Sequence, residues 1–507
     1  MDNETDNHSA GSPTSRPNDP AAQDHAQDHA VVLGAGLAGL LAARVLATKF
    51  ARVTLVERDE LPEAGPAFRP GVPQSRHVHV LWSRGLELME QMLPGITGKL
   101  VAAGAVVLES PRDFLWLSPA GWFGAVPGAE VLLAGREVID WTVRQEVLRD
   151  GRIRVRAGSA ATGLVAGADG GSVTGVRLRE GEPLTARLVV DATGRTSKAS
   201  DWLAALGYEV PEASRCDSRL AYSSRSFAAP KDPGRRWRGV YVQGRPDSPR
   251  GGVLVPLDGD RWLVTLLGYG SGHAPPTKDE EFLDFARTLR SPALYDAIRD
   301  AEPLSPATGF RGTANEWRHY ERVERWPAGF IVLGDAACRF NPVYGHGMTV
   351  AALAADALAA AIRDLGPAEI PGAARRLQRR TAAAAEVAWQ IATSEDQRYP
   401  GTEGPPPDRA TRILQKYMSR VMAGHRRSGD LRALLRRPVP VRPAEHPPQP
   451  GHGGARPVQV APPHGPGDHR LPLPPRPAGG VAATGSRPPP ARRARGHQRS
   501  AGRLTPI

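Results

Sequence analysis

The chain contains little cysteine and no apolar run suited to a membrane span. Only Cys216 and Cys338 occur in 507 residues, which excludes a disulfide framework and a cysteine-rich metal site. The most apolar stretch, residues 31–47, is interrupted by three glycines and by Arg44, so it lacks the purity of a transmembrane helix. The acidic N-terminus also lacks the basic start and apolar segment of a secretory signal. We therefore expect a cytoplasmic protein with no membrane span and no metal site.

Both ends of the chain lack aromatic residues. Residues 1–29 carry six acidic residues against Arg16, and residues 438–507 contain 28 Pro or Gly among 70 positions, with no lysine. Segments without aromatic side chains and with so few apolar ones bury too little surface to fold, so we expect a disordered tail at 1–29 and a segment unable to pack at 438–507. His25 and His29 are spaced i, i+4 within AQDHAQDHA, and we interpret them as part of the solvated N-terminal tail and not as metal ligands.

The C-terminal tail carries much of the positive charge of the chain. Ten arginines against Glu445 and Asp468 give it +8 of the total of +12. The basic excess is therefore poor support for a nucleic-acid partner, and we expect none. The abrupt change of composition at Pro438 is typical of a disordered tail or of a shifted reading frame in GC-rich coding sequence, and we prefer the second interpretation.

A glycine-rich turn lies between an apolar strand expected at 31–33 and a helix expected at 37–46. Residues 34–39 (GAGLAG) match GxGxxG in the strand, turn and helix context that makes the motif informative. Glycine permits the tight turn and lets the backbone approach a diphosphate, while the helix N-terminus attracts the anion. A second strand, 52–56, ends at Glu57, whose carboxylate can accept ribose hydroxyls. These residues predict a dinucleotide site.

A second acid at a strand end, far along the chain, indicates which dinucleotide is bound. Residues 330–335 (FIVLGD) form an expected strand that ends at Asp335, and a Pro- and Gly-rich turn leads into an Ala-rich helix expected at 347–365. An NAD dehydrogenase has no need of this feature, whereas the ribityl and isoalloxazine half of FAD must be held at a distance from the adenosine half. Asp335 can bind a ribityl hydroxyl, and the helix N-terminus can face the flavin where the reduced ring carries negative charge. The combination predicts FAD.

Several motifs together carry a family resemblance. They are GxGxxGxxxAxxL (34–46), VERD (56–59), the helix from Arg136 to Arg144, DATGR (191–195) and GDAxxxxNPVYGxGM (334–348). With these motifs the chain resembles class A FAD-dependent monooxygenases of the p-hydroxybenzoate hydroxylase type. Within that class, GVPQxxHVHxL (71–81), DATGRxSxxxxWLxxLGY (191–208) and the run 317–336 are most similar to actinobacterial polyene epoxidases of polyether and terpenoid biosynthesis. The resemblance covers about residues 30–425.

The resemblance implies an α/β fold with a Rossmann-like (GR2-type) FAD-binding domain in discontinuous segments, an inserted β-sheet substrate domain and C-terminal helices. The expected division of the chain is a disordered tail (1–29), the first FAD-binding segment (30–110), a substrate-domain excursion (111–135), the second FAD-binding segment (136–207), the β-rich substrate domain (208–316), the third FAD-binding segment (317–366), the C-terminal helices (367–437) and the Pro/Arg/Gly-rich tail (438–507).

The resemblance also implies which residues contact FAD. Gln74 and His77–His79 fall where the family's loop approaches the cofactor, and their role stays open. The chain departs from the family at His346, where relatives often carry Gln, and after Arg437, where the closing helices have no recognisable counterpart. The predicted cofactor-binding set is Gly34, Ala35, Gly36, Leu37, Ala38, Gly39, Glu57, Arg58, Arg136, Asp335, Pro342, Gly345, His346, Gly347 and Met348.

The implied reaction transfers one oxygen atom from a C4a-hydroperoxyflavin to a small apolar substrate, with NAD(P)H as electron donor directly or through a flavin reductase. The flavin performs the chemistry, so no catalytic side chain is assigned. Alkene epoxidation needs no side-chain base, whereas phenol hydroxylation benefits from one. No Tyr, His or Glu in 208–315 is singled out as such a base. This favours alkenes of a polyene polyketide or terpenoid, with aromatic-ring hydroxylation as the alternative.

Other readings of the chain are weaker. A flavin-dependent halogenase would carry WxWxIP, which is absent here. A geranylgeranyl-reductase-like enzyme, which transfers hydride instead of oxygen, remains a less favoured alternative, and polyanion binding rests only on the Arg-rich tail. Eight aromatic residues could line a long apolar pocket, although each is more readily explained as sheet core: Trp116, Trp122, Tyr222, Phe227, Trp237, Tyr241, Trp262 and Tyr269.

Overall fold

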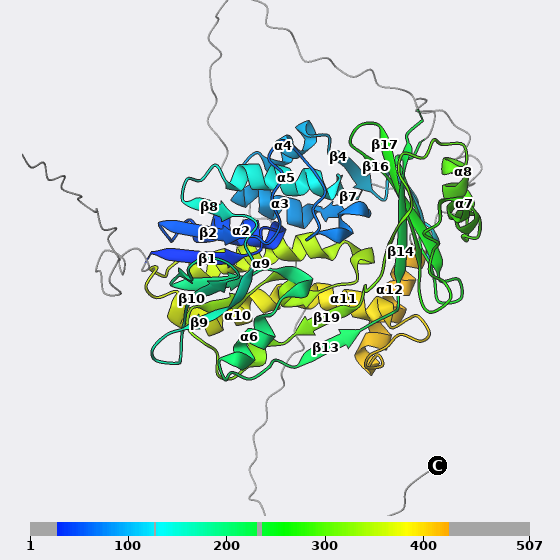
Figure 1. Ribbon diagram of the computed structural model, residues 1–507. Coiled ribbons are helices and arrows are strands. Elements are labelled where there is room, and N and C mark those ends of the chain that lie inside the picture. Colours follow the sequence, from blue (N-terminus) through cyan, green and yellow to red (C-terminus); the bar gives the residue numbers. More distant parts are fainter. Residues whose placement is uncertain (1–27, 126–127, 231–235, 425–507) are drawn as a thin grey trace, which may run out of the picture. The chain divides into compact units, whose positions relative to one another are not determined.

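The computed structural model describes residues 28–125, 128–230 and 236–424 (Figure 1). A five-stranded parallel sheet has the order β20-β12-β1-β2-β8. Its strands are β1 (His29–Leu33), β2 (Arg52–Val56), β8 (Ile153–Arg156), β12 (Leu188–Asp191) and β20 (Phe330–Val332). Segments that lie far apart in the sequence therefore combine in one sheet.

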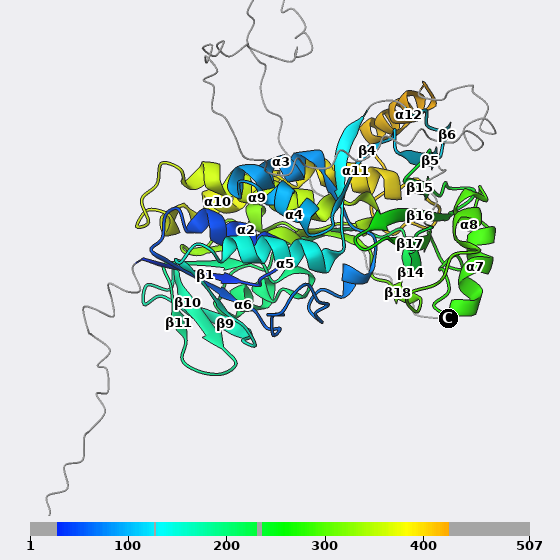
Figure 2. The ribbon, with the colours of Figure 1, turned by 90° about the horizontal axis from the view of Figure 1, so that it is seen from above.

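Helices cover one face of this sheet (Figure 2). They are α2 (Leu37–Leu46), α3 (Ser83–Met92), α4 (Ile96–Ala102), α5 (Arg136–Val147), α9 (His346–Ile362) and α10 (Ala374–Ala383). Val32, Val190 and Ile331 point to this face and pack with Leu40 of α2 and Leu358 of α9. Strands buried on both faces read as continuous apolar runs, which is why the first strand lacks a polar alternation.

The other face packs against a small antiparallel sheet and a short helix. The sheet contains β9 (Ala161–Ala166), β10 (Val173–Leu178) and β11 (Leu184–Thr185), and the helix is α6 (Ala199–Ala205). Val31, Val189 and Phe330 lie in this second core together with Val176 and Leu203. The carboxyl ends of β1, β12 and β20 are thereby held in a layered core, which leaves their loops to build a site.

A seven-stranded sheet forms the second large unit of structure. Its order is β18-β14-β17-β16-β15-β5-β6, with β5 (Phe114–Ser118), β6 (Gly121–Trp122), β14 (Ala221–Ala228), β15 (Gly239–Val242), β16 (Arg250–Leu257), β17 (Arg261–Gly268) and β18 (Thr308–Phe310). Helices α7 (Asp279–Arg287) and α8 (Ala293–Ile298) pack on its outer face through Phe282, Phe285 and Leu294 (Figure 2). The parallel pairing of β5 with β15 brings residues 114–117 into this sheet.

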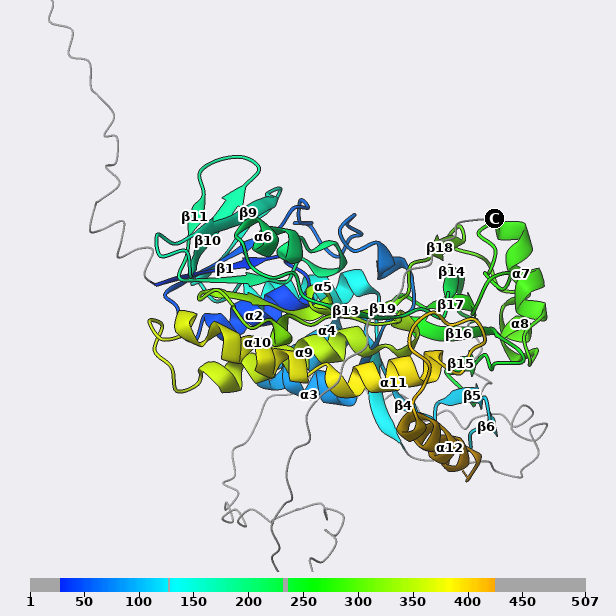
Figure 3. The ribbon, with the colours of Figure 1, turned by 90° about the horizontal axis from the view of Figure 1, so that it is seen from below.

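Two small sheets and further helices complete the described structure. One sheet contains β3 (Val80–Trp82), β7 (Ala129–Leu133) and β4 (Val106–Ser110), and the other contains β13 (Ala213–Cys216), β19 (Asn315–Arg318) and β21 (Cys338–Arg339). Helices α11 (Glu386–Asp396) and α12 (Arg409–Gly424) lie beside the seven-stranded sheet near β5 and β15 (Figure 3). No described helix is both long and apolar enough to span a membrane. Cys216 and Cys338 are buried free thiols.

The predicted α/β fold class, with several sheets and C-terminal helices, is confirmed by this architecture. The expected helix at 37–46 and strand at 52–56 have the predicted bounds. Helices α7 and α8 were not expected within the β-rich region. The predictions for residues 1–27 and 425–507, including His25 and the Arg-rich tail, lie outside the described residues.

The assignment of His29 to a solvated tail is wrong. His29 begins β1 and is 2% exposed. Its Nδ1 lies 2.7 Å from the carbonyl oxygen of Thr185 and its Nε2 lies 2.8 Å from Oγ1 of Thr54. Burial is the main cause that lowers the pKa of His29 to about 4. Two hydrogen bonds to neighbouring segments satisfy the neutral ring, which is why a polar residue can start a core strand.

Candidate cofactor and substrate site

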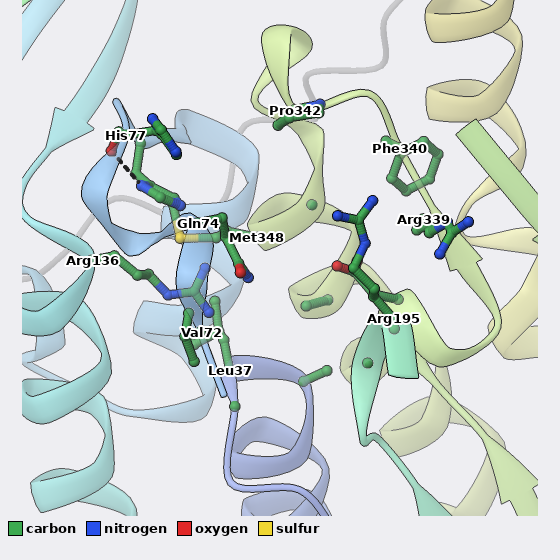
Figure 4. A pocket seen from close by; sticks show the side chains of 18 of the residues that line it. Leu37, Val72, Gln74, His77, Arg136, Arg195, Arg339, Phe340, Pro342 and Met348 are labelled. Atoms are coloured by element: carbon green, nitrogen blue, oxygen red, sulfur yellow. Dashed lines mark hydrogen bonds between the residues drawn. The ribbon is translucent and has the colours of Figure 1, made fainter. Parts of the chain in front are cut away.

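A connected cavity of about 840 Å³ joins the glycine turn to the seven-stranded sheet. Its volume lies within the upper range for small-molecule and cofactor pockets. Arg136, Pro342 and Met348 are among the residues that line it (Figure 4). Of the predicted cofactor residues, those that line the cavity are Gly34, Gly36, Leu37, Ala38, Glu57, Arg58, Arg136, Asp335, Pro342, Gly345, His346, Gly347 and Met348, whereas Ala35 and Gly39 do not.

The three motif glycines have different physical roles. Gly34 has φ +93°, and a Cβ there would lie 2.6 Å from the carbonyl oxygen of Ala192. A Cβ on Gly39 would lie 1.8 Å from the carbonyl oxygen of Gly34, so this glycine lets α2 pack against the turn. A Cβ on Gly36 would meet no atom within 4 Å. Gly36 caps α2 and lines the cavity, so its missing side chain leaves room for a ligand at the helix N-terminus.

Glu57 is held rigidly at the end of β2. Its Oε2 accepts hydrogen bonds from the backbone N–H of Ala35 at 2.7 Å and from Nη1 of Arg69 at 3.1 Å. Arg69 is 6% exposed and also lies 3.5 Å from Asp140. Arg69 was not predicted as a site residue, because it lies in a loop without periodicity or a motif. A rigid carboxylate beside the glycine turn suits the predicted ribose contact.

Arg136 starts α5 and points into the cavity (Figure 4). Its Nε donates to Oδ1 of Asp140 at 2.7 Å, one helical turn along. His79 lies beside this pair, and burial, followed by the nearby positive charge of Arg136, lowers the pKa of His79 to about 3. The ring of His79 is therefore neutral at physiological pH, and Arg136 lines the cavity beside it.

Asp335 follows β20 in a short 3₁₀ turn and faces the cavity. Asp335 is exposed at the cavity, and loss of hydration within the surrounding protein raises the pKa of its carboxyl, while Arg136, Arg195 and Arg339 oppose this effect. Gly345 then adopts a left-handed conformation, with φ +66°, and caps α9. The N-termini of α2 and α9 therefore both lie at the cavity, where each favours a negatively charged group.

The loop with Gln74 and the histidines connects this region to the substrate-side sheet. Gln74, His77 and His79 all line the cavity. Nδ1 of His77 lies 2.7 Å from Oγ of Ser224 in β14, and that hydroxyl lies 2.6 Å from Oγ1 of Thr265 in β17. Burial lowers the pKa of His77 to about 4. The sequence offered no signal for this chain of hydrogen bonds, because its members are distant along the chain.

Alternate residues of the seven-stranded sheet form the apolar wall of the cavity. Cross-strand pairing places Ser224 beside Thr265, Thr265 beside Val253, Val253 beside Tyr241, and Tyr241 beside Trp116. All of these except Ser224 line the cavity. Because side chains alternate along a strand, the intervening residues point to the outer core with α7 and α8.

The eight candidate aromatic residues divide between the cavity and the outer core. Trp116, Tyr222 and Tyr241 line the cavity. Phe227 and Trp262 lie in the outer core, and Trp122 and Trp237 pack against it. Tyr269 does not line the cavity and stacks on Tyr399 with ring centroids 3.7 Å apart.

The site has the features of a flavin dinucleotide pocket. A glycine leaves open space at one helix N-terminus, a second helix N-terminus lies at the same cavity, and Arg136, Arg195 and Arg339 supply positive charge along it. These are the groups that an anionic diphosphate and an electron-rich ring require. The fold and the site therefore define an FAD-dependent flavoprotein.

Comparison with known proteins identifies the family. Residues 28–395 match the model of the family described as FAD binding domain. The chain is also 35% identical over 383 residues to Protein Rv3254 of Mycobacterium tuberculosis, an alignment that covers 72% of this chain and 79% of the relative. The chain belongs to this FAD-binding family, and its cofactor is FAD.

Solved structures share the fold at low sequence identity. The flavin-dependent brominase Bmp2 has a TM-score of 0.56 at 15% identity and covers 78% of this chain and 94% of its own. PqsL of Pseudomonas aeruginosa, described as a probable FAD-dependent monooxygenase, has a TM-score of 0.54 at 19% identity and covers 74% of this chain and 99% of its own. At this identity the likeness extends to the fold and not to the substrate.

Proposed function

We propose that the chain epoxidises one or more alkenes of an apolar polyene polyketide or terpenoid, using one oxygen atom of O2. The observation that carries the proposal is the connection of the glycine turn and Asp335 to the apolar face of the seven-stranded sheet within one cavity. A cofactor at one end and an apolar substrate at the other can thereby meet without entering bulk water.

The predicted cofactor residues would hold FAD along one side of the cavity. The N–H groups at Gly36 would bind the diphosphate, and Glu57 the ribose of the adenosine. Asp335 and Arg136 would face the ribityl chain, and the loop 342–348 would lie against the flavin ring. FAD supplies the redox and oxygen-transfer chemistry when bound, with electrons from NAD(P)H directly or through a flavin reductase.

The substrate-side wall supports an alkene over a phenol. Burial raises the pKa of Tyr222 and of Tyr241, so both stay protonated at neutral pH. Burial lowers the pKa of His77 to about 4, so its ring is neutral and a weak base. Among the described residues of this wall, none is suited to withdraw the proton of a phenol, and epoxidation needs no such step. The wall would instead orient the substrate and exclude water.

Aromatic-ring hydroxylation is the second candidate. It is favoured by the hydrogen-bond chain from His77 through Ser224 to Thr265, which could relay a proton. A reductase of the geranylgeranyl-reductase type is a third, less favoured, candidate. We also place the protein in the cytoplasm in this proposal.

The test is an oxygen-labelling assay on purified holoenzyme. Linear polyenes, prenylated aromatics and phenols are incubated with NAD(P)H, with and without a flavin reductase, under ¹⁸O2. We expect labelled epoxides from polyenes. Labelled phenol products alone would favour ring hydroxylation, and a reduced product without label would exclude a monooxygenase. A protein that gains no flavin absorbance with added FAD would contradict the cofactor assignment itself.

Two matched variants test whether the apolar wall of the cavity binds the substrate. Val253→Trp adds a large ring at the substrate-side wall, whereas Val210→Trp makes the same change at a residue that is 56% exposed and outside the cavity. We expect Val253→Trp to retain FAD and lose product, and Val210→Trp to retain both.

A further inference from the structure

Asp396 is a buried carboxylate that the proposed reaction does not use. It is the last residue of α11 and is 0% exposed. It lies one residue beyond the segment 28–395 that matches the family model. Neither the family resemblance nor a sequence motif assigns a role to it.

Three neutral side chains donate hydrogen bonds to this carboxylate. The hydroxyl of Tyr344 donates to Oδ1 at 2.7 Å, and Nδ2 of Asn315 donates to Oδ2 at 2.7 Å. Nδ2 of Asn341 lies 3.0 Å from both oxygens. Three donors that converge on one group require an acceptor with several lone pairs, which a carboxylate provides.

Two of these donors belong to the loop that faces the cavity. Asn341 directly precedes Pro342, and Tyr344 directly precedes the left-handed Gly345 that caps α9. The carbonyl oxygen of Tyr344 accepts a hydrogen bond from Nε1 of Trp82 at 3.2 Å. The loop is therefore tied to α11 on one side and to β3 on the other.

Joining two segments through a buried carboxylate costs free energy, because the charge loses its hydration and here meets only neutral partners. Burial raises the pKa of Asp396 to about 6, and the hydrogen bonds from Asn341 and Tyr344 oppose this effect. An apolar contact could join α11 to the loop with less loss of hydration. Unlike an apolar contact, the carboxylate fixes the distance and direction of the hydrogen bond from each donor.

We propose that Asp396 is a positioning residue of the flavin site, which fixes the loop 342–348, including the N-terminus of α9, through Asn341 and Tyr344. The inference rests on the proposed function, in which this loop lies against the flavin ring. The C-terminal helix α11 then acts on the cofactor without touching it. A displaced loop would change the donors and the helix dipole that the reduced ring meets.

The test compares FAD binding and flavin properties in Asp396→Asn, Tyr344→Phe and a matched control. Asp396→Asn keeps the shape but replaces one acceptor oxygen by a donor group, and Tyr344→Phe removes one hydrogen bond with little change of volume. The control is Asp279→Asn, because Asp279 also joins two segments, through the N–H of Ala307 at 2.7 Å and through Arg225 at 3.0 Å, but lies outside the cavity.

We expect about a tenfold increase in the Kd for FAD in Asp396→Asn, together with altered visible circular dichroism of bound flavin and a shifted midpoint potential. Tyr344→Phe should change the flavin signals in the same direction by a smaller amount. Asp279→Asn should leave the Kd, the spectrum and the potential as in the wild type, even where it lowers the melting temperature.

The outcomes separate this inference from the proposed function. A wild-type protein that does not bind FAD contradicts the cofactor site and the inference together. If the wild type binds FAD and both Asp396→Asn and Tyr344→Phe retain its spectrum, Kd and potential, only the positioning role is wrong. If Asp396→Asn does not fold, Tyr344→Phe decides, because the carboxylate and its other two donors remain.

Discussion

Replacement of Gly36 by alanine should separate folding from cofactor binding. Gly36 has φ −76° and ψ 176°, a backbone conformation open to alanine. An added Cβ would meet no protein atom within 4 Å, while the residue lines the cavity at the N-terminus of α2. The new methyl group would therefore occupy the space that we assign to the diphosphate.

The expected magnitudes differ for stability and for binding. Alanine is somewhat poorer than glycine as a helix cap, so the free energy of unfolding of the apoprotein should fall by about 1 kcal/mol or less. Loss of one charge-assisted hydrogen bond to the diphosphate removes about 1.5–3 kcal/mol, which is about a 10- to 150-fold increase in the Kd for FAD.

The assay combines urea unfolding of the apoprotein with titration of FAD by flavin fluorescence. Gly98→Ala is the matched control, because its Cβ would also meet no atom within 4 Å but lies in α4, outside the cavity. Gly39→Ala should instead impair folding, since its Cβ would lie 1.8 Å from a backbone oxygen. A Gly36→Ala protein with the wild-type Kd for FAD would refute the placement of the diphosphate.

Three further predictions concern buried titratable groups and the cavity wall. Burial raises the pKa of Asp396 from 3.8 to about 6, so ionisation of this carboxyl should lower the free energy of unfolding by about 2 kcal/mol as the pH rises from 4 to 6. Asp396→Asn should remove this component in urea titrations. Burial lowers the pKa of His29 from 6.5 to about 4, so the unfolded chain takes up a proton at a higher pH than the folded protein does. About 3 kcal/mol of the free energy of unfolding that is present above pH 6.5 should therefore be lost as the pH falls to 4. His29→Gln should remove this dependence on pH. Val253→Trp should abolish product formation while flavin absorbance stays unchanged, and equal turnover would contradict the substrate-side wall.

The cofactor half of the site could be predicted because its constraints are local. The turn at Gly34 requires positive φ, and the close packing at Gly39 excludes any Cβ, so glycine spacing records the geometry directly. Glu57 directly follows β2, as expected, whereas β20 ends at Val332 and Asp335 lies in the 3₁₀ turn after that strand. Their contacts with FAD remain predictions.

The partners of buried polar groups could not be predicted, because they come from distant segments. Asp396 meets Asn315 and Asn341 only after α11 packs against the cavity loop. Arg69 lies in a loop, and its pairing with Glu57 depends on how that loop folds back over the turn. His29 was misplaced because an acidic, repetitive segment continues up to the first core strand without a compositional boundary.

The aromatic residues show what strand alternation can and cannot decide. Tyr222 and Phe227 are five residues apart in β14 and must point to opposite faces. The sequence could therefore predict that the two side chains lie on opposite faces of the sheet. It could not predict which of them faces the cavity, because the helices α7 and α8 that cover the outer face were not expected. One unrecognised pair of helices thus left the lining of the whole wall undetermined.

Charged side chains and neutral titratable side chains line different parts of the cavity. Arg136, Arg195, Arg339 and Asp335 line the part of the cavity that we assign to FAD, where an anionic dinucleotide requires charge. The titratable residues of the substrate-side wall are driven toward their neutral forms by burial, as for Tyr241. A neutral, poorly hydrated wall suits transfer of an electrophilic oxygen to an alkene, since no charged intermediate of the substrate needs a partner there. Burial keeps the groups of this wall neutral, so none of its described residues is suited to act as a base.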